Sequence, residues 1–272
     1  MTARTRSVLL WVLAVLITLA AAAYQRLTGP TYPVSGRARI GDTTLRFRLD
    51  RSHAGSTDHL VRVGVPDGEW RGWLRHRLHG SADGWTLVEM TLDGGALAGA
   101  LPHQPPAGKI DYQVFLAPPP PEGGTPGDEA AVLGEAAPLT DPVTIRFRDP
   151  VPIAVLIPHV LLMFAAMLTS NRAGFEGLLR RGDPRRLAVW TFWLILVGGI
   201  LVGMLVQKYS FHVWWTGFPL GDDITDSKTL VAQVAWLIAL LASRRGGRAA
   251  RFWVVVAAVV TFGIFLIPHS MS

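Results

Sequence analysis

The fold of this chain is decided by residues 189–229, VWTFWLILVGGILVGMLVQKYSFHVWWTGFPLGDDITDSKT. The stretch begins with an apolar run over 190–206, which is long enough for a helix that crosses a bilayer. It becomes polar and aromatic over 207–228 and turns apolar again at Leu230. A segment of this length exceeds a tight turn, so the pattern predicts two membrane-spanning helices joined by a loop.

Similar apolar runs occupy residues 7–24, 151–170, 187–206, 224–242 and 252–267, so five spans are predicted. The first run leaves two interpretations open. It is a cleaved signal peptide or an N-terminal transmembrane anchor over 1–24, and either one exports the residues that follow. We favour the anchor, because signal peptides carry an apolar region of only about 7–15 residues.

The charge distribution predicts how the spans are oriented. The net charge is +6, and Arg dominates two short segments beside apolar runs, 171–186 and 243–251. Positive residues concentrate in cytoplasmic loops. We therefore expect a bacterial-type inner (plasma) membrane protein with a cytoplasmic N-terminus and an exoplasmic β domain, loop 207–228 and C-terminus. This pattern argues against nucleic acid as a partner, and the absence of Cys excludes disulfides and thiolate metal sites.

Residues 25–149 have the alternating pattern of β-strands. In DTTLRFRLD, Leu45, Phe47 and Leu49 alternate with Arg, which predicts one buried and one solvated face. Seven or eight such segments, separated by PDG, SADG and DGG, predict an antiparallel β-sandwich. The Pro- and Gly-rich residues 118–138 interrupt this domain and are expected to form a mobile loop.

Within this domain, residues 101–114, LPHQPPAGKIDYQV, resemble the approach to a late strand in fibronectin-III and immunoglobulin-like domains. The resemblance implies that Tyr112 is a corner tyrosine whose hydroxyl bonds back to the preceding loop. Domains of this type mostly bind or space other proteins, although a fold alone assigns no activity.

One tetrapeptide, LIPH, occurs twice and ends at His159 and at His269. In the predicted topology both copies lie in the outer half of the membrane, and His212 lies in the outer loop. The candidate ligands for a transition metal or haem are these three histidines with two nearby carboxylates: His159, His269, His212, Asp223 and Asp226. The alternatives are purely structural hydrogen bonding by His159 and a proton relay.

The segment GDDITDSKT also has a structural interpretation. Asp223 or Asp222 is expected to cap the fourth helix, with Asp226 in its first turn. Lys228 or Lys208 is expected to pair with these carboxylates.

The sequence therefore predicts five transmembrane α-helices, with an exoplasmic antiparallel β-sandwich between helices 1 and 2 and a four-helix transmembrane domain over 150–272. No GxSxG or phosphate-binding loop is present, which argues against a soluble-type enzyme. The expected function is an accessory or interaction protein. Its partners are the lipid bilayer and other membrane or exoplasmic subunits. The alternatives are a metal- or haem-binding protein and a small-solute or proton transporter.

Overall fold

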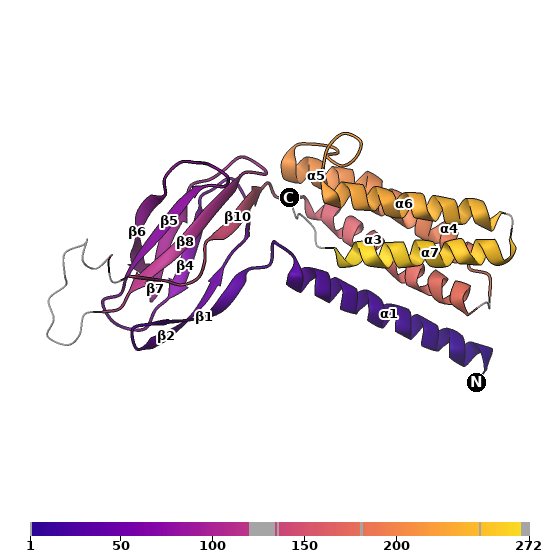
Figure 1. The fold of residues 1–272 in the computed structure, drawn as a ribbon, viewed down its shortest axis with the longest axis horizontal. Helices are drawn as coiled ribbons and strands as arrows, with labels where there is room; N and C mark the ends of the chain where they lie inside the picture. Colours follow the sequence, from indigo (N-terminus) through magenta and orange to yellow (C-terminus); the bar gives the residue numbers. More distant parts are fainter. Residues whose placement is uncertain (1, 120–133, 135, 180–181, 245, 268–272) are drawn as a thin grey trace. The chain divides into compact units, whose positions relative to one another are not determined.

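The computed structural model of the chain describes residues 2–119, 134, 136–179, 182–244 and 246–267. Its contacts divide the chain into two compact units. The helical unit contains Met1–Pro30 and Val151–Ser272, and the β unit is Thr31–Pro150. In the order of the sequence, a separate β-sheet region thus follows the first helix and precedes the remaining helices; Figure 1 labels these elements.

Five helices of the part that the structure describes are long and apolar enough to cross a membrane. Four of them are continuous α-helices: α1 (Ala3–Thr28), α3 (Ile153–Leu178), α6 (Ile224–Ser243) and α7 (Gly247–Leu266). Helix α3 contains Pro158 near its start. The fifth is continuous from Arg185 to Phe211 and consists of α4 (Arg185–Leu194), a π-helical segment η1 (Ile195–Leu201) and α5 (Val202–Phe211).

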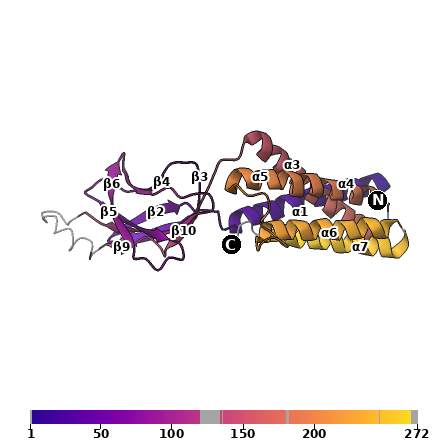
Figure 2. The ribbon, with the colours of Figure 1, turned by 90° about the horizontal axis from the view of Figure 1, so that it is seen from above.

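Small side chains let the helices pack closely. Helix α3 contacts α1, α4 and α7, while α6 contacts α4 and α7 (Figures 1 and 2). Their common core is rich in alanine, and its large members are Trp236 and Ile195. The Trp236 indole N–H donates to the Thr261 hydroxyl at 2.8 Å, which joins α6 to α7. Such small-residue interfaces are typical of membrane helices, where close contact replaces hydrophobic burial.

The β unit contains two sheets. Strands β1 (Val34–Ile40) and β2 (Thr43–Leu49) form an antiparallel hairpin. The larger sheet has the order β3-β10-β8-β5-β6-β7-β4, with β9 beside β8. Its strands are β3 (Ser52–Ala54), β4 (His59–Gly64), β5 (Arg71–Leu78), β6 (Thr86–Asp93), β7 (Ala96–Leu101), β8 (Lys109–Ala117), β9 (Ala137–Pro138) and β10 (Val143–Arg148).

The alternating pattern decides which residues form the core of the β unit. Leu45 and Leu49 of β2 are buried while the arginines between them are exposed, as the sequence pattern predicts. These leucines share one apolar cluster with Val61 and Val63 of β4, so the hairpin packs against the larger sheet. Burial of such side chains supplies most of the driving force for this packing.

Three predictions from the sequence concern the β unit, and a fourth concerns the loop that follows α5. The pairing of β10 with β3 is parallel, so the strands are not all antiparallel. The Tyr112 hydroxyl bonds the carbonyl of Asp50 at 2.7 Å and not the preceding loop, so the prediction of its partner was wrong. Most of the predicted mobile loop 118–138 lies outside the described residues, but its end forms β9. Helix α5 continues to Phe211, which shortens the predicted loop 207–228.

Candidate functional site

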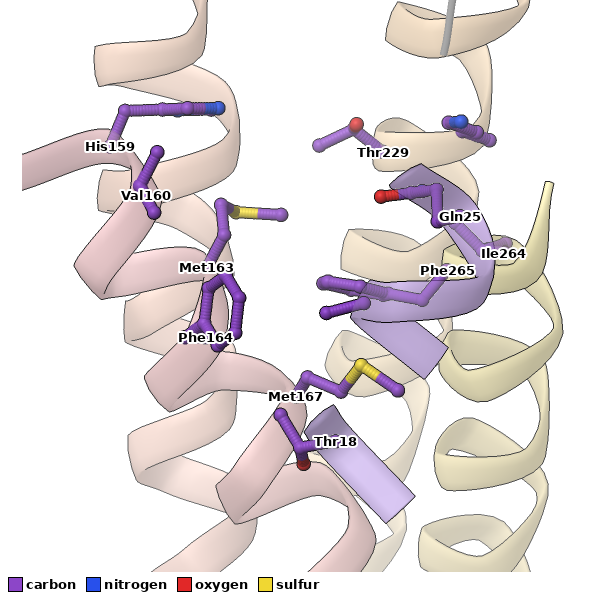
Figure 3. A pocket seen from close by; sticks show the side chains of 12 residues that line it. Thr18, Gln25, His159, Val160, Met163, Phe164, Met167, Thr229, Ile264 and Phe265 are labelled. Atoms are coloured by element: carbon purple, nitrogen blue, oxygen red, sulfur yellow. The ribbon is translucent and has the colours of Figure 1, made fainter. Parts of the chain in front are cut away.

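The helical unit contains a pocket of about 150 Å³ between α1, α3, α6 and α7. His159, Thr229 and Gln25 lie toward one end of the pocket, and Met167 and Thr18 lie toward the other (Figure 3). The lining residues are Thr18, Ala22, Gln25, His159, Val160, Met163, Phe164, Met167, Lys228, Thr229, Ile264 and Phe265. An apolar pocket with a few convergent polar groups is a typical ligand site.

The imidazole of His159 is held in place by the backbone of the neighbouring helix. Its Nδ1 atom lies 2.9 Å from the carbonyl oxygen of Gly198 in η1. The glycine makes this approach possible, because a Cβ at residue 198 would lie only 2.5 Å from the Cβ of Leu162. The absence of a side chain at residue 198 therefore lets α3 come close enough for its histidine to reach a main-chain carbonyl. Short π-helical segments are frequent at functional sites.

This hydrogen bond fixes the tautomer of the ring. A carbonyl oxygen only accepts, so Nδ1 must donate, and a neutral imidazole then carries its lone pair on Nε2. No residue that the structure describes bonds to Nε2. The ring lines the pocket, where Nε2 can accept a proton from a ligand or coordinate a metal ion.

Two methionines continue the same face of α3. Met163 and Met167 follow His159 at intervals of four residues, and all three side chains project from α3 into the pocket (Figure 3). Each interval advances about 6 Å along a helix. One metal ion can therefore bind His159 together with Met163, or the two thioethers together. The three groups are spread too far along the pocket for all of them to bind one ion.

Two donors from different helices complete the polar end. Lys228 Nζ of α6 donates to the carbonyl oxygen of Ile267 at 2.8 Å, and Gln25 Nε2 of α1 donates to the same oxygen at 3.2 Å. Lys228 is only 7 % exposed. A cation within a span is costly and is usually held by such backbone carbonyls.

The structure describes four of the five residues that were predicted to bind a metal. His212 is exposed and ends α5 in a left-handed conformation. Asp223 caps α6, accepting from the amides of Thr225 at 2.7 Å and Asp226 at 3.1 Å. Within the described ranges, no group of three or more His, Asp or Glu side chains is arranged to hold a metal. His269 lies outside those ranges, so the five-residue site stays a prediction.

Asp226 and the two lysines make contacts with the backbone that the sequence did not predict. Asp226 lies in the first turn of α6 and accepts from the amide of Thr216 at 2.8 Å, which ties the preceding loop to the helix. Lys208 donates to the carbonyl of His212 at 3.0 Å and so caps α5. The sequence analysis missed that Lys228, Gln25 and the methionines share a pocket with His159. The i, i+4, i+8 spacing on α3 was the available signal.

Comparisons with known proteins add no assignment: no protein-family model matches the sequence, and neither a curated protein nor a solved structure matches it.

Proposed function

We propose that this multi-pass membrane protein binds a small ligand from the bilayer in the pocket at His159. The observation that carries the proposal is the bond from His159 to Gly198, which leaves Nε2 as an acceptor beside a cavity. Val160 and Phe164 line the same cavity and are each 41 % exposed on the helical unit. In a membrane this surface faces lipid, so an apolar molecule has a lateral route into the pocket.

Filling the pocket tests this proposal. Ala22→Phe places a ring among the lining residues, whereas Ala154→Phe adds the same ring at an exposed position of α3. We expect a small molecule to co-purify with the full chain and with Ala154→Phe, and to be lost in Ala22→Phe. Mass spectrometry of solvent extracts from the purified proteins makes the comparison. Equal small-molecule content in the three proteins contradicts the proposal.

A second candidate ligand is a soft metal ion such as Cu(I). It is favoured by the imidazole and thioether that His159 and Met163 bring to one helix face, because thioethers select soft ions. The cavity is far smaller than a porphyrin needs, which argues against haem. Metal analysis tests this candidate: Met163→Leu should lose copper, while Met204→Leu, outside the pocket lining, should keep it.

We further propose that the β unit is an immunoglobulin-like sandwich that contacts a partner, as expected for an accessory protein. Support comes from arginine side chains of β5 that stack on neighbouring aromatic rings. Arg75 lies 4.6 Å from the ring of Trp85 and 4.8 Å from that of Phe115, and Arg77 lies 4.6 Å from Trp85. Trp and Arg are enriched at binding hot spots. Trp85→Ala should abolish recovery of a partner from mildly solubilised membranes, whereas Leu60→Ala should not.

The proposed orientation, with the β unit outside, is supported by the Arg-rich segments 171–186 and 243–251. The chain contains no Cys, so single substitutions can be mapped directly. In intact cells, a membrane-impermeant maleimide should label Ser56→Cys. Arg186→Cys should react only after permeabilisation. The reverse pattern would overturn the orientation.

Transport of protons or a small solute also stays a prediction, and it requires that His159→Leu stops flux in liposomes.

A further inference from the structure

The size of the pocket narrows the class of ligand. The pocket has a volume of about 150 Å³, and an enclosed cavity of this volume in another protein accommodates one benzene ring. A bare metal ion would leave most of this volume empty, and a porphyrin would not enter it. The cavity therefore fits one six-membered ring better than either alternative.

The walls of the pocket suit an aromatic ring. Phe164 of α3 and Phe265 of α7 line its apolar part together with Met163 and Met167 (Figure 3). Aromatic side chains pack against other rings in offset or edge-to-face geometry, and thioether sulfur makes favourable contacts with ring edges. These contacts favour an aromatic ligand over an aliphatic one of equal size.

The polar end suits a ligand that both donates and accepts hydrogen bonds. No described residue donates a hydrogen bond to His159 Nε2, so a ligand hydroxyl is the group best suited to donate one. Lys228 and Gln25 place two donor groups at the same end, around the carbonyl of Ile267. A ligand oxygen on that side would act as an acceptor. A ring with hydroxyl groups provides both functions, whereas a purely hydrocarbon ring provides neither.

We infer that the pocket binds the dihydroxybenzene head group of a lipid-borne quinol, with one hydroxyl donating to His159 Nε2. The inference rests on the proposed function, which requires only that the pocket binds a ligand from the bilayer. The exposed side chains of Val160 and Phe164 mark the side on which the isoprenoid tail of such a molecule would remain in lipid. The assignment concerns binding and includes no electron transfer.

The test compares two probes that differ in their hydrogen-bond donors and by the two methyl groups that replace the hydroxyl hydrogens, so the effect of His159→Leu identifies the contribution of the hydrogen bond. Decylubiquinol and its dimethyl ether are titrated into the full-length protein in nanodiscs under anaerobic conditions. Loss of one hydrogen bond to a buried acceptor corresponds to roughly a tenfold change in affinity. We expect the quinol to bind about tenfold more tightly than the ether. We also expect His159→Leu to remove this difference and Met204→Leu, outside the pocket lining, to preserve it.

Each outcome has a distinct meaning. If the quinol and the ether bind equally to the wild-type protein, the quinol assignment is wrong while a ligand pocket remains. If neither probe binds and Ala22→Phe changes nothing, both the assignment and the proposed function fail. Copper in the wild-type protein, together with its loss in Met163→Leu, would replace the quinol by a soft metal ion.

Discussion

The Nδ1 atoms of His53 and His59 lie 3.2 Å apart in the β unit. The Nε2 atom of His53 lies 3.0 Å from the carbonyl oxygen of Thr57, which only accepts, so this nitrogen must donate. In neutral His53 the Nδ1 atom is then the acceptor, and His59 donates to it. Protonation of both rings would place two donors against each other, so the pair requires at least one neutral imidazole.

The stability of the β unit should therefore fall in acid. Burial lowers the pKa of His59 below its usual value of 6.5, the neighbouring His53 lowers it further, and Asp50 partly opposes them. Below about pH 6.5 the unfolded chain binds a proton that the folded state resists, so stability is complete above this pH and decreases as the pH falls. Hydrogen exchange of the β4 amides in the full chain, corrected for intrinsic rates, measures the effect.

The control for this pH dependence is His59→Gln, which cannot acquire a proton. Its exchange protection should change less between pH 8 and pH 5 than that of the wild-type protein. An equal acid response in the two proteins would place the titrating group elsewhere.

Removing the hydroxyl of Tyr112 should destabilise the β unit. The side chain is fully buried, and its hydroxyl donates to the carbonyl of Asp50 at 2.7 Å. Tyr112→Phe leaves that carbonyl without this donor, which typically costs about 1–2 kcal/mol. Protection of the β8 amides should decrease accordingly, while the exposed Tyr24→Phe should have no effect on them. Unchanged protection in Tyr112→Phe would mean that water replaces the lost donor.

The helices could be predicted because their signal is local. A sufficiently long apolar run has to form all of its backbone hydrogen bonds internally, so the five spans follow from composition. Their ends were less predictable. Gln207 and Lys208 are polar but form helix readily, so α5 continues through them to Phe211. The π-helical segment at Gly198 could not be predicted, because it depends on how closely α3 approaches.

The candidate site was only partly predictable. The sequence indicated His159 because an ionisable group within a span is unusual. It could not show that α1 lines the same pocket, since Gln25 and Thr18 lie more than 130 residues from His159 in the chain. His212 and Asp223 were grouped with His159 because they share its predicted side of the membrane. The structure shows His212 and Asp223 at helix ends, and the metal site stays a prediction because His269 lies outside the described residues.

The close approach of α3 and η1 predicts a different outcome for two similar glycine substitutions. In Gly198→Ala the new Cβ would meet Leu162, and overpacking of this kind costs about 1–3 kcal/mol. Gly263→Ala in α7 meets nothing within 4 Å, and alanine favours helix, so stability should stay equal or rise slightly. Thermal unfolding in detergent compares the two variants. Equal loss of stability in both would show that helix geometry, and not the contact with α3, controls position 198.

The buried bond between Trp236 and Thr261 offers a measure of how polar contacts stabilise the helical unit. Thr261→Val keeps the shape of the side chain but leaves the indole N–H, at a fully buried position, without its acceptor. In a membrane protein the coupling energy of such a pair averages about 0.6 kcal/mol, because the unfolded helices in lipid also find partners. A double-mutant cycle with Trp236→Phe, measured by unfolding in mixed micelles, should give a coupling near this value. Additive effects would mean that Trp236 stabilises the α6–α7 interface through its packing alone.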